Sequence, residues 1–304
     1  MDFRTIQYFV TVAQELNFTR AAEKLHMSQP PLSMQIRTLE DDLGVQLFVR
    51  GKRSLRLTEA GHVLLRRSMQ MLELSDKTRM EMAAFGAELS GRICIATVDG
   101  RAPFLAAEWI GGFRERYPNV EFSIWNGSSD DVINRLARGL ADVGIVISPY
   151  DTEHLEGIPV WREPWVALMS EKHPYASLPG DELPLEMLSG QKLIGPQRTS
   201  RQEAINRWFL QIGQEPHVIC TLSNYMDAAA LAMQGAGICI YPQTSRQTWP
   251  GIVSKVLVNP ARMAEYALIC FRDQKPFGAA LEFISYVSEW KAGRNEPADD
   301  AVLL

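Results

Sequence analysis

Residues 3–16 show a regular spacing of apolar side chains. They recur at steps of three and four residues, which predicts an amphipathic helix with one buried stripe: Phe3, Ile6, Phe9, Val10, Ala13 and Leu16. Residues 17–19 interrupt the pattern, and Thr19 is placed to cap a short second helix. Its small residues Ala21 and Ala22 allow another helix to approach closely.

A third helix is predicted after a turn at residues 26–27. Ser28 is its expected cap, Pro30 and Pro31 fit its first turn, and Gly44 ends it. Its apolar stripe is expected to face the core: Leu32, Ile36, Leu39 and Leu43. The opposite face is left pointing outward: Gln29, Pro30, Ser33, Met34 and Arg37.

This outward face has the chemistry that reads DNA bases in the major groove. Gln pairs with adenine, Arg pairs with guanine, and Pro or Met contacts thymine methyl groups. The alternative is an ordinary solvated face. The following segment favours DNA, because Val45, Leu47 and Val49 alternate with polar residues. A turn then begins at Gly51, and Leu55 and Leu57 alternate again, which predicts a small hairpin or wing.

The charge pattern agrees with a DNA-binding head. The whole chain carries a net charge of −5, but residues 50–67 hold only one acidic residue, Glu59. The basic residues of this stretch form a positive stripe suited to phosphates: Arg50, Lys52, Arg53, Arg56, Arg66 and Arg67.

The same residues carry a family resemblance. The motifs are Phe18-Thr19-Arg20-Ala21-Ala22, Ser28-Gln29-Pro30-Pro31-Leu32-Ser33, Gln35-Ile36, Leu39-Glu40, Leu43-Gly44, Leu47-Phe48 and Leu57-Thr58-Glu59-Ala60-Gly61. They resemble LysR-type transcriptional regulators. The resemblance implies contacts to double-stranded promoter DNA by the third helix and the wing. The candidate DNA-binding residues are therefore Thr19, Ser28, Gln29, Pro30, Pro31, Ser33, Met34, Arg37, Arg50, Lys52 and Arg53.

Residues 1–58 are thus predicted to be a winged helix-turn-helix, and residues 59–89 a linker helix. The linker holds no proline, and Thr58 is a natural cap. Its apolar seam is irregular: Leu65, Met69, Leu72, Met80, Ala83 and Ala84. Two arrangements remain open, pairing with a second copy or packing within the same chain. The resemblance implies pairing into a dimer, usually within a dimer of dimers.

Residues 90–304 alternate short apolar runs with helical patterns, which predicts an α/β domain with parallel sheet and covering helices. The expected strands are 93–98, 120–125, 142–147, 165–170, 192–194, 217–222 and 237–241, and the expected helices are 104–117, 130–140, 201–212 and 224–234. The resemblance implies two lobes like those of periplasmic binding proteins. Lobe I takes about residues 90–162 and 265–295, and lobe II about 163–264.

Ligands of such sheets bind in the crevice at the carboxyl ends of strands. The candidate effector-binding residues are Thr97, Asp99, Gly100, Ser128, Ser129, Ile147, Ser148, Pro196, Arg198, Thr199, Ser200, Arg201, Ser223 and Asn224. Ser129 is the foremost candidate, although a serine there is equally typical of an ordinary capped helix start. Arg198 and Arg201 oppose an acidic rim, so a ligand with donor and acceptor ends is expected, such as an amino-acid-like or hydroxylated acid.

Enzymes are the main rival class. The sequence shows no phosphate loop, nucleophile elbow or zinc-protease helix, and its five histidines are scattered. The four cysteines are expected to be buried free thiols: Cys94, Cys220, Cys239 and Cys270. We therefore expect no catalytic residue, metal or cofactor beyond a small-molecule effector, and a cytoplasmic protein without a membrane segment. A purely architectural DNA protein would not need the α/β domain.

For mechanism, the resemblance implies that a bound ligand closes the two lobes. Closure would change how the dimers lie against one another, and so alter DNA bending or contact with RNA polymerase.

The head yields a paired prediction. Arg53→Ala should weaken binding to all sequences and reduce the salt dependence of log K by about one unit, because a phosphate contact is lost. Gln29→Ala should instead relax base preference by about 1–3 kcal/mol at one position. Band-shift titrations at several salt concentrations, with operator and scrambled duplexes, measure both effects. The reverse assignment would mean that another segment reads the bases.

Overall fold

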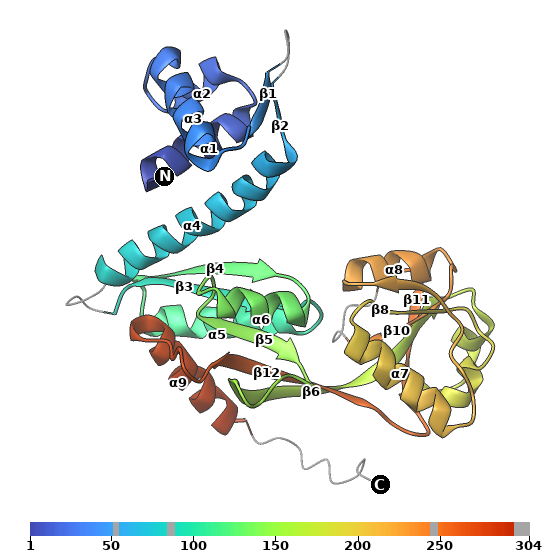
Figure 1. The fold of residues 1–304 in the computed structure, drawn as a ribbon. Helices are drawn as coiled ribbons and strands as arrows, with labels where there is room; N and C mark the ends of the chain where they lie inside the picture. Colours follow the sequence, from blue (N-terminus) through green and yellow to red (C-terminus); the bar gives the residue numbers. More distant parts are fainter. Residues whose placement is uncertain (51–54, 84–88, 244–248, 295–304) are drawn as a thin grey trace. The chain divides into compact units, whose positions relative to one another are not determined.

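The computed structural model describes residues 1–50, 55–83, 89–243 and 249–294 (Figure 1). The chain divides into two compact units, Met1–Phe85 and Gly86–Leu304, and each is described by itself. No helix within these ranges is both long enough and apolar enough to cross a membrane.

The first unit begins with three helices, α1 (Phe3–Glu15), α2 (Phe18–Lys24) and α3 (Gln29–Leu43), as the apolar spacing predicts. The core between these three helices is formed by fully buried side chains, each 0% exposed: Phe9, Val12, Ala21, Leu32 and Ile36. The expected stripes were too long at their ends. Phe3, Leu16 and Leu43, which lie at or next to helix ends, are exposed.

Two helix starts also differ from the expectation. Asn17, not Thr19, caps α2, since its side chain accepts hydrogen bonds from the backbone N–H groups of Thr19 and Arg20. Ser28 occupies the N-cap position of α3, but its hydroxyl makes no capping bond.

The wing is the antiparallel pair β1 (Phe48–Arg50) and β2 (Leu55–Leu57). Leu47 and Phe48 are buried, whereas Val45 and Val49 are exposed, so of the three positions expected to alternate inward only Leu47 does so. The ring of Phe48 lies 5.5 Å from that of Phe9, which anchors the hairpin on α1.

The linker helix α4 spans Glu59–Ala83. Thr58 caps it, because its hydroxyl accepts from the backbone N–H of Gly61 at 3.0 Å. Leu64, Leu65 and Leu72 pack on the head core, while Met69 of the predicted seam is 49% exposed. Part of the seam therefore packs within its own chain.

The second unit contains two lobes. The first lobe holds β3 (Gly91–Thr97), α5 (Ala102–Arg116), β4 (Val120–Asn126), α6 (Ser129–Ala137), β5 (Val143–Ile147), the first part of β6 (Leu155–Ser170), β12 (Met263–Phe271) and α9 (Gly278–Ala292). Its strand order is β4-β3-β5-β12-β6. The strands β3, β4 and β5 are parallel, whereas β12 is antiparallel to both of its neighbours.

The second lobe holds the rest of β6 and the elements η1 (Pro174–Ser177), β7 (Glu182–Pro184), η2 (Leu185–Leu188), β8 (Leu193–Pro196), α7 (Thr199–Gln211), β9 (Val218–Leu222), α8 (Tyr225–Met233), β10 (Ile238–Pro242) and β11 (Ile252–Val258). Its strand order is β6-β10-β8-β9, with β11 pairing with β6 and β7. The fold is α/β as expected, but both sheets are mixed rather than parallel.

Strand β6 belongs to both lobes (Figure 1). Leu155–Pro164 pairs with β12 in the first lobe, and Trp165–Ser170 pairs with β10 and β11 in the second. The sequence predicted a strand only for 165–170, because proline and charged residues interrupt the earlier part. Its prolines are tolerated there because this part of β6 lies at the edge of the first sheet.

An aromatic cluster forms much of the first-lobe core. Phe283 of α9 lies 5.2 Å from Phe113 of α5 and 5.6 Å from Phe122 of β4, measured between ring centroids. Trp109 packs edge-on against the same ring. Edge-to-face packing of buried rings stabilises this joint between two helices and the sheet.

Removing the central ring should destabilise the lobe. Phe283 is 0% exposed, so Phe283→Ala should lower the free energy of unfolding by about 3–5 kcal/mol. Phe104→Ala, at an exposed position of α5, is the matched control and should change it by less than about 1 kcal/mol. Urea titration followed by circular dichroism measures both, and equal effects would contradict the assignment of this core.

Candidate functional site

The outer face of α3 presents the candidate DNA-reading side chains together. Gln29, Pro30, Pro31, Met34 and Arg37 are exposed, and Ser33 is half-buried. The apolar stripe on the other side is at most 1% exposed: Leu32, Ile36 and Leu39. Thr19 and Ser28 are exposed at the starts of the two helices. The helix therefore combines a firmly packed side with an accessible polar one.

Glu40 ties the wing to α3. Its carboxylate accepts hydrogen bonds from the backbone N–H groups of Leu47 and Phe48 at 2.8 and 3.1 Å. The sequence analysis gave Glu40 no structural role. Its partners lie in the segment that follows the end of α3. Lys52 and Arg53 lie outside the described residues, as does the side chain of Arg50, whose backbone belongs to β1.

In the second unit, a cleft of about 470 Å³ opens between the two lobes. Eight of the candidate effector residues line it: Asp99, Ser128, Ser129, Pro196, Arg198, Thr199, Arg201 and Ser223. Seven further residues line it: Val98, Gly127, Asp130, Asp131, Gln197, Leu222 and Tyr241. Asp130 and Asp131 belong to the acidic rim expected from the sequence, and Gln197 lies between the candidates Pro196 and Arg198. The sequence did not single out the other four. Tyr241 follows the pattern used for the others, since it lies near the end of strand β10.

The other candidate residues lie next to the cleft without lining it. The hydroxyl of Thr97 is buried and donates to the carbonyl oxygen of Val98. The hydroxyl of Ser148 lies 3.5 Å from Glu265, and Asn224 caps α8. The remaining three are Gly100, Ile147 and Ser200, and none of these six is among the lining residues.

Asp99 connects the lobes across the cleft. It follows β3 in the first lobe, and its carboxylate accepts from the Tyr241 hydroxyl at 2.5 Å and from the backbone N–H of Tyr225. Burial raises the pKa of Asp99, and these two hydrogen bonds oppose the rise. One carboxylate of the first lobe thus accepts two hydrogen bonds from the second lobe.

Arg198 makes a second connection. Its guanidinium pairs with Asp130 of α6 at 3.0 Å and lies 3.5 Å from the carbonyl oxygen of Ile147. Sequence reasoning treated Arg198 as a free cation facing an acidic rim. In the structure much of that charge is already matched by Asp130.

Three helices begin at the cleft, and their first turns differ. Ser128 and Asp131 form a reciprocal capping box on α6, and Asn224 caps α8. No side chain caps α7, so its first N–H groups have no side-chain acceptor there. Close to these turns are three buried polar atoms without a hydrogen-bond partner among the described residues: Ser129 Oγ, Ser200 Oγ and Arg201 Nε.

Burial lowers the pKa of the Arg201 guanidinium, and the nearby Tyr241, Tyr266 and Asp99 counteract the fall. The side chain therefore remains a cation in a poorly solvated position. A positive charge with an unused N–H and two unused hydroxyl groups can bind an anion.

Both units match models of known protein families. The model described as a bacterial regulatory helix-turn-helix protein of the lysR family matches residues 3–62, and the LysR substrate binding domain matches residues 86–292. The chain belongs to the LysR family.

Relatives of known role agree with this LysR assignment. The chain is 29% identical over 301 residues to the Hca operon transcriptional activator HcaR of Escherichia coli, covering 98% of this chain and 94% of that protein. Its fold is similar to that of CbnR, a LysR family transcriptional regulator, with a TM-score of 0.78, 25% identity, and coverage of 96% and 99%. CbnR in complex with its target DNA gives a TM-score of 0.76 at 24% identity, with the same coverage.

This LysR protein is therefore a DNA-binding transcriptional regulator, not an enzyme, and its second unit is an effector-binding domain. Among the described residues, one group of three side chains of metal-binding type lies within 4.8 Å: Asp151, Glu153 and His154. All three are exposed, and His154 Nδ1 lies 2.7 Å from Asp151. Two of the four cysteines are buried, Cys239 and Cys270; Cys220 is exposed, contrary to expectation, and Cys94 is half-buried.

A buried carboxylate lies where the LysR effector domain crosses between lobes. Glu163 of β6 is 5% exposed, and its Oε1 accepts from the Tyr266 hydroxyl at 2.8 Å. The Tyr266 oxygen also lies 3.3 Å from the backbone nitrogen of Arg101. Burial raises the pKa of Glu163 from 4.5 to about 7, despite the hydrogen bond and the nearby Arg101. Glu163 stands between Arg162 and Pro164 in the sequence, outside the strand expected at 165–170, so no sequence signal marked it as buried.

Glu163 should make stability depend on pH. The folded state binds the proton more tightly, so the linked stability is complete below about pH 4.5 and is lost as the pH rises through about 7. Between pH 5 and 8, the wild type should therefore lose on the order of 3 kcal/mol relative to Glu163→Gln, which has no charge to bury. Urea titration followed by tryptophan fluorescence at each pH measures the difference.

The matched control is Glu153→Gln, at an exposed position. Its stability should follow that of the wild type at every pH. Parallel curves for wild type and Glu163→Gln would show that Glu163 does not change protonation in this range.

Proposed function

We propose that the inter-lobe cleft binds a small anionic effector whose acid group lies between Ser129 and the first turn of α7. The observation that carries this proposal is the pair of buried polar atoms without partners on residues that line the cleft, Ser129 Oγ and Arg201 Nε, beside a helix start that no side chain caps. A carboxylate would accept hydrogen bonds from these groups and lie near the positive end of the helix dipole.

The rest of the cleft favours a ligand with a second polar end. The Asp99 carboxylate and the Tyr241 oxygen, which are bonded to each other, can each still accept a hydrogen bond from a ligand, while Val98, Pro196 and Leu222 supply apolar wall. The volume of about 470 Å³ is in the range of small-molecule sites, about 300–1,000 Å³. A hydroxylated or amino-bearing carboxylic acid meets these requirements.

The lobe contacts suggest how the effector acts. Asp99 and Arg198 already join the lobes through Tyr241, Tyr225 and Asp130. An anion bound between Ser129 of one lobe and Arg201 of the other adds a third connection and shifts the protein toward lobe closure. Closure then changes the position of one dimer against another, and with it DNA bending or contact with RNA polymerase.

We infer that α3 enters the major groove of promoter DNA. We also infer that the protein acts in the cytoplasm, where that DNA lies. Met34 and Arg37 stand exposed opposite the packed stripe, and Gln29 is exposed at the first position of the helix. Thr19, Ser28, Pro30, Pro31 and Ser33 border this face and complete the proposed contact surface, with Arg50, Lys52 and Arg53 of the wing assigned from the sequence.

The proposed assembly is a dimer through α4, and then a dimer of dimers. The helix bears an exposed apolar stripe besides the side that packs on the head: Val63, Met71, Leu74 and Met82, each at least 39% exposed. Viewed down the helix axis, these four side chains fall within an arc of about 100°. A stripe of this width suits pairing with a second copy. We accordingly assign residues 1–58 to DNA binding, 59–89 to dimerisation and 90–304 to effector binding.

The effector proposal is tested with a panel of small carboxylic acids, each matched with its neutral amide. A subset of the acids, and not their amides, should raise the melting temperature of the full chain. Arg201→Ala should weaken binding of such an acid by about 10–100-fold in calorimetry, because one charge-assisted hydrogen bond is lost. Arg207→Ala, exposed on the same helix, should leave the affinity unchanged. Equal affinity for acid and amide, or for both variants, would contradict the proposal.

A further inference from the structure

Asp99 bonds to the opposite lobe through both of its carboxylate oxygens. Oδ1 accepts from the Tyr241 hydroxyl at 2.5 Å, and Oδ2 accepts from the backbone N–H of Tyr225. Asp99 lies just after β3 of the first lobe, whereas Tyr241 belongs to β10 and Tyr225 to α8 of the second lobe. A carboxylate from one lobe therefore fills a position that the other lobe builds.

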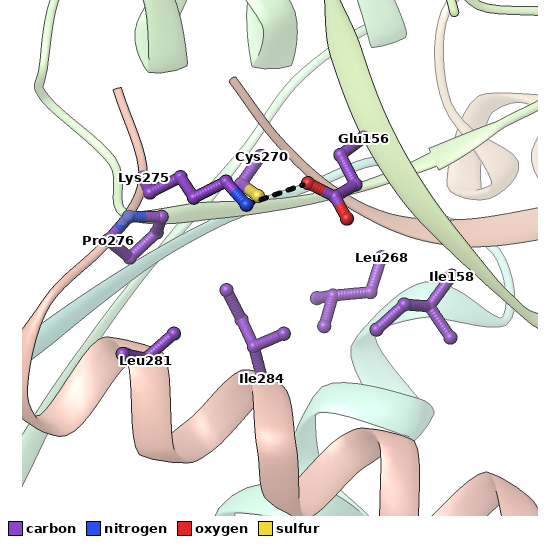
Figure 2. A pocket seen from close by; sticks show the side chains of 8 residues that line it. All are labelled: Glu156, Ile158, Leu268, Cys270, Lys275, Pro276, Leu281 and Ile284. Carbon is purple, nitrogen blue, oxygen red and sulfur yellow. Dashed lines mark ion pairs between the residues drawn. The ribbon is translucent and has the colours of Figure 1, made fainter. Parts of the chain in front are cut away.

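The smaller pocket of the first lobe has no part in this contact. It has a volume of about 120 Å³ and lies between α9 and the strands β6 and β12 (Figure 2). Leu268 and Ile284 face its interior, and the Lys275–Glu156 ion pair lies at one side at 3.6 Å. All of the residues that line it come from the first lobe, so it does not join the two lobes.

Tyr241 and Tyr225 are both buried beside the start of α8. They are 4% and 7% exposed, and their ring centroids lie 5.6 Å apart. Tyr225 is the first residue of α8, where backbone N–H groups have no acceptor within the helix. The Asn224 side chain accepts from Asp227, and Asp99 accepts from Tyr225. The first turn of α8 thus takes one acceptor from its own lobe and one from the other.

Most groups of the second lobe around Asp99 favour its ionised form. Burial raises the pKa of Asp99, whereas the bonds from Tyr241 and Tyr225 and the charge of Arg201 lower it. The charge of Asp227 raises it again. A hydroxyl, a helix N–H and a nearby cation are donors that bind free carboxylates. The second lobe therefore presents the features of a carboxylate site, with Asp99 inside it.

Removal of the Asp99 carboxylate would leave the Tyr241 hydroxyl without this acceptor in a buried position. A buried donor without a partner costs free energy, so binding of another acceptor is favoured. Asp99→Ala removes only the carboxyl group and keeps the β-carbon. Formate consists of the same carboxyl group, so it matches both the space and the donors that the substitution leaves.

We propose that the second lobe contains a carboxylate-binding site, formed by Tyr241, the first turn of α8 and Arg201, which Asp99 occupies as a built-in ligand. The occupied site holds the two lobes together before any effector binds. Where the proposed function holds, it also directs the acid group of an effector to Ser129, because the position at α8 is already filled. The site itself rests only on contacts within the chain.

The experiment follows deuterium exchange of the Tyr225 amide in the full chain by mass spectrometry at one fixed pH. In Asp99→Ala this amide should exchange about tenfold faster than in the wild type, because it has lost its acceptor. A molecule as small as formate binds in the millimolar range at best, so it is added at about 0.1 M. Formate should then slow the exchange in Asp99→Ala about threefold or more.

Three controls separate a carboxylate site from a general effect. Formamide, the neutral counterpart, and sodium chloride at equal concentration should leave the exchange in Asp99→Ala unchanged. Formate should have no effect on the wild type, whose site is filled. Asp131→Ala removes a carboxylate that lines the same cleft but bonds within the first lobe, so its Tyr225 amide should behave as in the wild type.

Asp99→Ser, which keeps a short polar side chain, provides a second variant should Asp99→Ala not fold, and the same response to formate is expected. Adding Tyr241→Phe to either variant should remove most of that response. The proposal is overturned if the Tyr225 amide keeps its wild-type rate without Asp99, if formate does not slow it, if formamide or chloride acts as strongly, or if the response survives Tyr241→Phe. The acid panel above measures binding at Ser129 and Arg201, so the two proposals can fail separately.

Discussion

The pairing of β6 with β12 is the constraint on which the effector-binding domain depends. One continuous strand supplies an edge to the first sheet and a member to the second, so the two sheets share one backbone. The Glu163–Tyr266 hydrogen bond lies on these two strands where they pass between the lobes. The residues that line the cleft come from both lobes, and β6 joins these lobes through one backbone.

The cleft itself is made from ends of strands and starts of helices. Local sequence specifies both, because apolar runs mark the strands and Ser, Asn or Asp residues mark the helix starts. For this reason Ser129, Thr199, Arg201 and Ser223 could be placed at one site from the sequence alone. The apolar stripe of α3 was predictable on the same ground, since a period of 3.6 residues separates the buried Leu32 and Ile36 from the exposed Met34 and Arg37.

The features that sequence reasoning missed depend on contacts between distant segments. The partners of Asp99 are 126 and 142 residues away, and Tyr266 is 103 residues from Glu163. The first part of β6 was missed because its prolines and charges obscure the alternation expected of a strand. Prolines are tolerated there only because this part of β6 lies at the edge of the first sheet. One error was local. Asn17 was overlooked as the cap of α2 because Thr19, two residues later, is an equally suitable residue type.

The Glu40 contacts have a mechanical consequence for the DNA-binding head. Because one carboxylate on α3 holds the two backbone amides that lead into β1, the helix and the hairpin are joined as one rigid body. In the proposed complex, α3 and the wing would then contact the duplex at a separation that Glu40 helps to set. Groove width would enter recognition directly there, because a duplex of unsuitable shape could satisfy only one contact at a time.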